Sequence, residues 1–365
     1  MTTTDDNISY QRYQRQIILP EINHSGQEKI SKAKVLVIGA GGLGCPVLQY
    51  LVAAGVGSIG IVDGDTVSIS NLHRQILYNT QDLGKPKAST AAQKLKELNP
   101  LVEIKVFQEN IHADNVFKIF ENYQIIVDCS DNFATRYLVN DACVITKKTF
   151  VSASIYKFEG QLSVFNYKNG PTYRCIFPSP PENGSIQNCS EIGVIGAIAG
   201  ILGTLQAAET IKVILRLGDI LSGKLLLIDM LTMSFNTLKF RTIPTNKAIT
   251  RLIDYEVFCG EIPKETVQSI QYETILSWQK QNKKFQLIDV REKQEHLVEN
   301  IGGENIPSQV LDNNTNLINL TSDPIIFYCQ SGNRSESVIK NLLKNKIKGD
   351  FFHLNGGLNS IKTTN

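Results

Sequence analysis

Three glycines near the N-terminus have the spacing of a phosphate-binding turn. The segment 35–51 is VLVIGAGGLGCPVLQYL, in which Gly39, Gly41 and Gly44 form the pattern G-x-G-x-x-G between an apolar run and a helical one. Glycines let the backbone approach a phosphate, and the start of the following helix supplies free N–H groups and a positive dipole end. The pattern fits NAD, FAD and ATP alike, so it predicts a nucleotide without naming it.

Polar residues elsewhere in the chain could complete this nucleotide site. Asp63 lies 19 residues after Gly44, at the end of the apolar run 59–62, where a ribose hydroxyl needs a partner. Cationic and amide side chains that could hold phosphates are Arg12, Arg15, Asn71, Arg74, Lys85 and Lys87. Several cations around one phosphate turn favour a triphosphate, whose charge must be neutralised, over NAD.

Two carboxylates at the end of another apolar run indicate a metal site. The segment 124–132 is QIIVDCSDN, which places Asp128 and Asp131 directly after a strand-like run. Mg²⁺ commonly takes one or two carboxylates together with phosphate oxygens. We therefore expect ATP with Mg²⁺ at this turn.

A second group of reactive residues stands near the C-terminus. In the segment 324–335, PIIFYCQSGNRS, Cys329 follows an apolar run and Arg334 closes a loop before a helical pattern. Such a loop directs backbone N–H groups at the sulfur and, with an arginine nearby, stabilises a thiolate or a persulfide. The alternative is a buried cysteine that simply ends a strand.

Strands and helices alternate along the chain and would position these residues. The predicted helix 86–98 lies between two of the predicted strands, which favours βαβ units and a parallel sheet. The predicted strands are 59–62, 102–107, 124–132, 149–155 and 160–167. The chain is therefore expected to have an α/β fold.

The length of 365 residues predicts two domains. Periodicity fades over 243–266, which we interpret as a linker, and a second, smaller α/β pattern begins at 267. The most apolar segment, 192–205, is expected to be a buried helix that is too short to cross a membrane.

Composition narrows the class of protein. The formal net charge is only +2, which gives no electrostatic argument for a nucleic acid or a membrane surface. The seven cysteines are odd in number and widely spaced, unlike a disulfide framework, and the N-terminus has no apolar run that could serve as a signal peptide. We expect a cytoplasmic protein with free thiols.

The first part of the chain resembles a known family. The motifs RYQRQI, GAGGLG, DGDTVSISNLHRQ, GKPK and DCSDN are similar to those of the adenylyltransferases related to ubiquitin-activating enzymes, which serve molybdopterin and thiamine synthesis. The resemblance covers residues 8–242. It implies a Rossmann-like ATP-binding domain with a mixed sheet. It also implies a homodimer that adenylates the C-terminal glycine of a ubiquitin-like sulfur-carrier protein.

The resemblance also implies roles for individual residues. It assigns Asp131 to Mg²⁺, and Arg15 to the ATP of the neighbouring subunit. The positions that it assigns to ATP within one chain are Gly41, Gly42, Asp63 for the ribose, and Asn71, Arg74 and Lys87 for the phosphates.

Cys189 lies before the apolar segment, in NCSEIGVIG. A thiol at a helix N-terminus can have a lowered pKa, because the helix dipole stabilises the thiolate. Members of the family often have a cysteine here that takes part in thioester, persulfide or acyl-disulfide chemistry. The alternative is a small residue that fills space at the start of a helix.

The resemblance departs from the family where it implies a structural zinc ion. The family usually has two C-x-x-C pairs, but here Thr172 and Glu256 replace the first cysteine of each pair and leave only Cys175 and Cys259. Structural zinc takes four ligands, mostly sulfur, and a threonine is a poor ligand. We therefore expect no zinc.

Residues 267–361 resemble the rhodanese-like sulfurtransferases, which carry a persulfide on a cysteine. The resemblance rests on the C-x4-R loop from Cys329 to Arg334, on LIDVREKQEH and on LNGGL. The loop is one residue shorter than the C-x5-R loop of cysteine phosphatases. Asp289 and Arg291 are interpreted as structural.

Together the two resemblances predict an enzyme that activates a carboxylate and delivers sulfur to it from a persulfide, whose donor is a further partner. Molybdopterin synthesis, thiamine synthesis and tRNA thiolation all remain open. Two other hypotheses are an NAD-dependent oxidoreductase and a carrier-binding scaffold without catalysis. Neither accounts for the cations, Asp131, Cys329 and Arg334 together.

Overall fold

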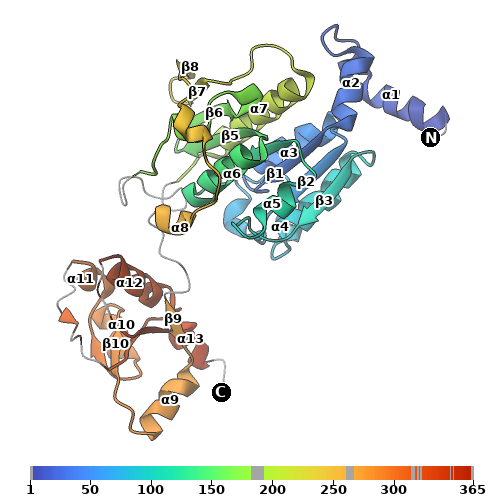
Figure 1. The fold of residues 1–365 in the computed structure, drawn as a ribbon. Coiled ribbons are helices and arrows are strands. Elements are labelled where there is room, and N and C mark those ends of the chain that lie inside the picture. The colour runs from blue at the N-terminus through green and yellow to red at the C-terminus, as the bar shows by residue number, and fades with distance from the viewer. Residues whose placement is uncertain are drawn as a thin grey trace. The chain divides into compact units, whose positions relative to one another are not determined.

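The computed structural model in Figure 1 describes residues 3–181, 193–259, 267–313, 317–318, 320, 323–345, 347 and 349–362. It divides into two compact units, Met1–Cys259 and Gly260–Asn365. Each unit has its own sheet and its own clusters of buried apolar side chains.

An eight-stranded mixed sheet forms the centre of the first unit. Its order is β3-β2-β1-β4-β5-β6-β7-β8; neighbours are parallel from β3 to β5 and antiparallel from β5 to β8. The strands are β1 (Lys34–Ile38), β2 (Ser58–Val62), β3 (Glu103–Phe107), β4 (Ile125–Asp128), β5 (Thr149–Tyr156), β6 (Glu159–Phe165), β7 (Lys224–Asp229) and β8 (Ser234–Lys239). The predicted α/β fold with a mixed sheet is confirmed.

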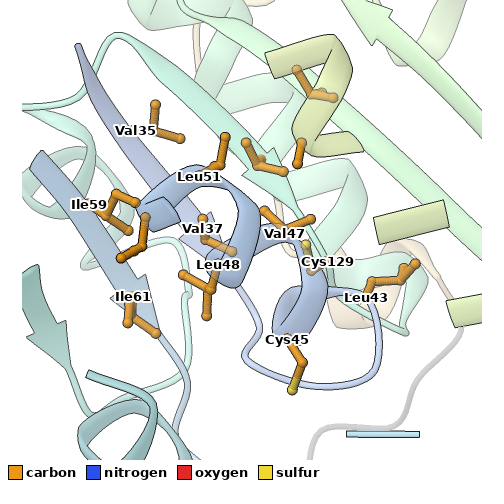
Figure 2. Packing of buried hydrophobic residues seen from close by; sticks show 14 of the residues in the cluster. Val35, Val37, Leu43, Cys45, Val47, Leu48, Leu51, Ile59, Ile61 and Cys129 are labelled. Carbon is orange, nitrogen blue, oxygen red and sulfur yellow. The ribbon is translucent and has the colours of Figure 1, made fainter. Parts of the chain in front are cut away.

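Helices cover both faces of this sheet because consecutive strand residues point to opposite sides. Val35 and Val37 of β1 pack with helices α3, α4 and α7, as Figure 2 shows for α3, whereas Leu36 and Ile38 pack with α5 and α6. The helices of this unit are α1 (Thr3–Ile17), α2 (Asn23–Lys32), α3 (Gly44–Ala53), α4 (Lys87–Leu98), α5 (Val116–Phe120), α6 (Phe133–Thr146), α7 (Gly196–Leu215) and α8 (Tyr255–Phe258). The unit therefore has three layers, with helices on both faces of the sheet.

Helix α7 has 20 residues and extends ten positions beyond the predicted end at Leu205. By length and composition alone it could cross a membrane, but 56% of its most apolar window is buried in the structure. Its polar residues Gln206 and Glu209 are buried and hydrogen-bonded within the first unit. These contacts are those of a core helix. The prediction that this helix was too short to span a membrane was wrong, because the helix has 20 residues.

Part of the segment predicted to be a linker belongs to the first unit. Helix α8 follows Asp254, whose side chain accepts a hydrogen bond from Val257 N. The Tyr255 side chain is buried in the α6 face of the first unit. Residues 260–266 lie outside the described part of the chain.

The second unit is built on a five-stranded parallel sheet with the order β11-β10-β12-β13-β9. Its strands are β9 (Gln268–Ile270), β10 (Gln286–Asp289), β11 (Glu304–Asn305), β12 (Ile325–Tyr328) and β13 (Phe351–Leu354). Its helices are α9 (Tyr272–Lys280), α10 (Lys293–Val298), α11 (Ser308–Asn313), α12 (Asn333–Lys344) and α13 (Gly357–Lys362). Strand β12 lies at the centre of this sheet and ends directly before Cys329.

Candidate active sites

The glycine turn connects β1 to α3, and the chain itself requires two of its glycines. Gly39 has a φ of +91°, and a Cβ there would lie 2.8 Å from the Cys129 carbonyl oxygen. A Cβ on Gly44 would lie 2.0 Å from the Gly39 oxygen. Gly41 has ordinary clearance, with Gln75 Nε2 3.5 Å from the position of its Cβ. The backbone of the turn therefore requires glycine at positions 39 and 44, whether or not a ligand binds there.

Asp63 follows β2 and holds the glycine turn in place. Its Oδ2 accepts a hydrogen bond of 2.7 Å from Ala40 N, and its Oδ1 accepts one of 2.9 Å from Asp65 N. Burial raises the pKa of this carboxyl, although the two N–H donors oppose the shift. Each oxygen keeps a further lone pair that could accept a ribose hydroxyl.

The loop after η1 (Ile69–Asn71) brings Arg74 to the glycine turn. Asn71 stabilises this loop, because its Oδ1 accepts a hydrogen bond of 3.3 Å from Ser68 N. A Cβ on Gly42 would lie 3.4 Å from Arg74 Cγ, so the arginine stem covers that glycine. Arg74 Nη1 donates to Ser70 O at 3.1 Å.

The remaining predicted cations are arranged differently. Lys87 begins α4, and its buried Nζ lies 2.8 Å from Oδ2 of the exposed Asp65. Arg12 donates to Leu98 O. Arg15 is exposed on α1 and has no contact with the glycine turn within the described part of the chain. Lys85 Nζ lies 3.4 Å from Asp82 Oδ1. Among the predicted cations that the structure describes, Arg74 and Lys87 therefore stand beside the turn and its Asp63 anchor.

The two carboxylates after β4 have opposite environments. Asp128 is completely buried, and its Oδ1 accepts hydrogen bonds from Ser130 N at 3.0 Å and Ser130 Oγ at 2.5 Å. Its Oδ2 accepts from Ser152 Oγ at 2.9 Å and Arg136 Nε at 3.4 Å. Asp128 is therefore structural, which leaves Asp131 as the carboxylate of this pair that could face a metal ion.

Asp131 is exposed and has no hydrogen-bond or ion-pair partner among the described residues. Asn132 precedes α6 as its N-cap, and its Oδ1 accepts a hydrogen bond of 2.8 Å from Thr135 N, which fixes the start of the helix two residues after Asp131. A free carboxylate on a fixed backbone fits a hydrated Mg²⁺ ion. The sequence did not single out Arg136 or Ser152, which hold the preceding turn, because they come from other elements.

The N-terminus of α7 also reaches the glycine turn. A Cβ on Gly196 would lie 2.2 Å from His73 O, and a Cβ on Gly42 would lie 3.2 Å from the Ala199 Cβ. The positive end of this long helix dipole therefore lies beside Gly42 and Arg74. Cys189, predicted to lie before this helix, is outside the described residues.

The loop after β12 closes around Cys329, whose side chain is fully buried. Gly332 N donates to Sγ at 3.2 Å, and Ser335 Oγ lies 3.7 Å from it. Gly332 has a φ of +89°, a conformation that favours glycine. The turn at Gly357 packs on this loop, since a Cβ there would lie 2.3 Å from Cys329 O.

Arg334 does not donate to the sulfur. Its Nη1 and Nη2 each donate a 2.7 Å hydrogen bond to the two carboxylate oxygens of Glu295. These bonds lower the pKa of Glu295 to about 2. The prediction placed Arg334 next to the thiol, but a carboxylate in the first turn of α10 takes its hydrogen bonds.

Asp289 and Arg291 form a buried ion pair with an N–O distance of 2.7 Å. His296 Nδ1 lies 2.9 Å from Asp289 Oδ2, and Arg291 Nη1 donates to Gln330 Oε1 at 3.1 Å. This network fastens the cysteine loop to β10. Contacts of this kind fit the structural role that we predicted for Asp289 and Arg291 from the sequence.

The residues at the implied zinc site make other contacts. Cys175 Sγ accepts hydrogen bonds from Thr172 N at 3.4 Å and Ile243 N at 3.3 Å. Thr172 is completely buried, and among the described residues no group of three or more His, Cys, Asp or Glu could hold a metal ion. These donors do not fit tetrahedral zinc.

A clamp of other residues joins the same two segments. Arg174 forms 2.8 Å hydrogen bonds with both carboxylate oxygens of Asp141, and its guanidinium lies 4.8 Å from the ring centres of Tyr137 and Phe258. Tyr255 Oη donates to Asp141 Oδ2 at 2.8 Å. This cluster ties η4 (Tyr173–Cys175) and α8 to α6 without a metal.

Known proteins resemble most of the chain. It is 40% identical over 359 residues to the probable adenylyltransferase/sulfurtransferase MoeZ of Mycobacterium tuberculosis, covering 95% of this chain and 91% of that protein. It is 41% identical to the adenylyltransferase and sulfurtransferase MOCS3 of Culex quinquefasciatus over 365 residues, covering 92% and 83%. The sulfur carrier protein adenylyltransferase of Thermus thermophilus is 48% identical over 260 residues, covering 68% of this chain and 96% of that protein.

Solved structures share the fold of about two thirds of the chain. The crystal structure of E. coli MccB with ATP has a TM-score of 0.56 at 19% identity and covers 68% of this chain and 82% of that chain. The sequence profile of the ThiF family matches residues 13–248, and that of the rhodanese-like domain matches residues 274–364. The chain therefore belongs to the ThiF family and has a C-terminal rhodanese-like domain.

Proposed function

We propose that this enzyme uses ATP to adenylate the C-terminal carboxylate of a ubiquitin-like sulfur-carrier protein and then delivers sulfur to it from Cys329. The observation that carries the proposal is the free carboxylate of Asp131 at the same sheet edge as the glycine turn, Asp63 and Arg74. The names of the MoeZ, MOCS3 and Thermus relatives support this reaction class.

The first step forms an acyl-adenylate. A carboxylate oxygen of the carrier attacks the α-phosphorus of ATP, the bond to the bridging oxygen breaks, and pyrophosphate leaves. The carboxylate is itself the nucleophile, so the enzyme mainly has to position the reactants and neutralise charge. Arg74, Lys87 and the N-terminus of α7 supply that positive charge.

Asp131 would hold Mg²⁺, which supplies further neutralisation of the phosphate charge when it is bound. Asp63 would hold the ribose, and Asn71 would bind phosphate from the loop that it already stabilises. Asp128, Ser152 and Arg136 keep the turn before Asp131 in one conformation.

The second step moves sulfur. The terminal sulfur of a Cys329 persulfide attacks the acyl carbonyl and displaces AMP, which leaves an acyl disulfide. A thiolate then attacks Cys329 Sγ and breaks the sulfur–sulfur bond, so the carrier leaves as a thiocarboxylate and a new disulfide forms. A cellular thiol reduces that disulfide, which suits the cytoplasmic location expected from the cysteines.

Cys189 is our candidate for the attacking thiolate, on the strength of the sequence alone. The active assembly would be a homodimer in which Arg15 reaches the neighbouring subunit's ATP. The exposure of Arg15 and its lack of contact with the turn of its own chain support this arrangement. A persulfide-forming protein or small thiol would load Cys329.

A pull-down in the presence of ATP tests the proposal. The full-length protein is incubated with ATP, MgCl₂ and cell extract, and the small Gly-Gly-ending proteins that it retains are weighed by mass spectrometry. A carrier that gains the mass of AMP, or exchanges one oxygen for sulfur, supports the enzyme. A retained carrier of unchanged mass would instead support a scaffold without catalysis. Carriers of molybdopterin synthesis, thiamine synthesis and tRNA thiolation serve as candidate substrates.

A further inference from the structure

The arginine that closes the cysteine loop is already bound to a carboxylate of the protein. Arg334 Nη1 and Nη2 donate hydrogen bonds of 2.7 Å to Oε2 and Oε1 of Glu295 on α10. The Arg334 and Glu295 side chains are 39% and 36% exposed, so a molecule that comes from solvent can reach the pair. An internal anion therefore occupies both terminal nitrogens of this guanidinium.

Arg334 can act on the sulfur through its charge. The groups directed at Cys329 Sγ are uncharged donors, Gly332 N at 3.2 Å and Ser335 Oγ at 3.7 Å. The hydrogen bonds to Glu295 are the largest cause that raises the pKa of Arg334, and the charge of a Cys329 thiolate raises it further. The guanidinium thus lies within electrostatic reach of the sulfur, where Glu295 offsets its positive charge.

Two further cations on the elements around the loop also have carboxylate partners. The buried Arg291, which donates to Gln330 of the loop, lies 2.7 Å from Asp289 Oδ2. Lys340 of α12 lies 2.7 Å from Glu336 Oε1. An anion that approaches the loop therefore meets positive charges that the protein has already compensated.

Sulfur donors differ in the charge that they bring to Cys329. When the Cys329 thiolate attacks the outer sulfur of thiosulfate, the sulfur–sulfur bond breaks, sulfite leaves with the electron pair, and Cys329 keeps the outer sulfur as a persulfide anion. When it attacks the terminal sulfur of an organic persulfide R–S–SH, the thiolate R–S⁻ leaves and Cys329 becomes Cys329–S–SH. Thiosulfate carries two negative charges and is repelled by the thiolate, so it needs a free cation more than the persulfide does.

We propose that Glu295 is a specificity-determining residue for the sulfur donor, because it holds Arg334 away from anionic donors and so favours a persulfide that carries no further charge. This inference rests on the proposed loading of Cys329 with sulfur. Glu295 acts through Arg334 and not on the sulfur itself. Thiosulfate has to displace the Glu295 carboxylate before it gains a full positive charge, whereas an uncharged persulfide does not.

The test measures the loading of Cys329 in the full-length wild type, Glu295→Gln, Arg334→Gln and the double variant. The donors are thiosulfate and hydroxyethyl persulfide, and mass spectrometry follows the rate at which the Cys329 peptide gains one sulfur atom. Glu295→Gln should speed loading from thiosulfate roughly tenfold or more, because the freed guanidinium attracts the dianion. It should leave loading from the persulfide nearly unchanged. The double variant should lose the gain, and added salt should reduce it in Glu295→Gln.

Glu336→Gln is the matched control. It changes the net charge of the same unit equally, at a carboxylate that is also 36% exposed, but it leaves Arg334 paired, so it should not speed loading from thiosulfate. The inference is wrong if Glu295→Gln uses thiosulfate no faster than the wild type, if the gain persists without Arg334, or if Glu336→Gln shows the same gain. If neither donor loads Cys329 of the wild type, the proposed sulfur transfer itself is wrong.

Discussion

The guanidinium of Arg334 and the carboxylate of Glu295 meet in a two-point ion pair, with both N–O distances at 2.7 Å. The pair joins the cysteine loop after β12 to the first turn of α10. The Glu295 carboxylate also accepts a hydrogen bond of 3.1 Å from Glu292 N, which helps to hold this carboxylate in the position where it pairs with Arg334. A carboxylate of helix α10 thus helps to hold the cysteine loop in place.

This ion pair should make the stability of the second unit depend on pH in an acidic window. The folded state lowers the pKa of Glu295 from 4.5 to about 2, so the pair stabilises the unit fully above pH 4.5 and loses its effect as the pH falls towards 2. The side chains are 39% and 36% exposed, so its contribution is about 1 kcal/mol or less. Chemical denaturation of wild type and Glu295→Gln should show a difference that is constant from neutral pH to pH 5 and shrinks below it. A difference that stays the same at pH 3 would contradict this, and the exposed Glu304→Gln serves as control.

Asp131→Ala should abolish carrier-dependent exchange of pyrophosphate into ATP. The free carboxylate is the proposed Mg²⁺ ligand, and no other described carboxylate after β4 can replace it, since Asp128 is buried and fully hydrogen-bonded. Exchange is measured with labelled pyrophosphate. Asp114→Ala removes an exposed carboxylate and should leave exchange unchanged. Near-normal exchange in Asp131→Ala would remove Asp131 from the site.

Mixing two inactive variants tests whether Arg15 acts on the neighbouring subunit. Arg15→Ala and Asp131→Ala should each be inactive alone. Subunit exchange at equal amounts should restore about a quarter of wild-type activity, because half of the dimers are mixed and each mixed dimer has one intact site. A mixture that stays as inactive as either variant alone would show that Arg15 serves its own chain.

Cys329→Ala should leave adenylation intact and remove the transfer of sulfur from thiosulfate to cyanide. The two activities depend on separate units, and the loop around Cys329 has Gly332 N and Ser335 Oγ directed at this one sulfur. Thiocyanate formation and pyrophosphate exchange are measured on the same preparation. Cys259→Ser removes a different thiol and should retain both activities. Unchanged thiocyanate formation in Cys329→Ala would refute the persulfide role.

Purified protein should contain no stoichiometric zinc, and a chelator should not change its Tm. The Arg174–Asp141 ion pair joins η4 to α6, and its side chains are 12% and 3% exposed. Arg174→Met leaves a buried carboxylate without its cationic partner and should lower the free energy of unfolding by about 3 kcal/mol. Arg251→Met, at an exposed arginine, is the control. One zinc ion per chain by elemental analysis would overturn this account.

The sequence was informative where neighbouring residues decide the structure. The glycine turn and the strand that ends at Asp63 follow from local pattern, and the α/β fold follows from the alternation of strands and helices. It could not separate Asp128 from Asp131, because the burial of Asp128 depends on Ser152 of β5 and Arg136 of α6.

Two other features depended on distant partners. The predicted end of the apolar helix at Leu205 was placed where polar residues begin, but Gln206 finds Asp128 O and Glu209 finds Leu221 N, so the helix continues through them. Arg334 pairs with a glutamate 39 residues away that no local spacing connects to it. Polar contacts of this kind, between residues far apart in the chain, become visible only when the elements are assembled.

The separate cores of the two units have an evolutionary consequence. Substitutions in one core leave the packing of the other unchanged, so each unit can diverge at its own rate. The match to the Thermus thermophilus relative covers 68% of this chain and 96% of that protein, so a shorter protein of this family exists.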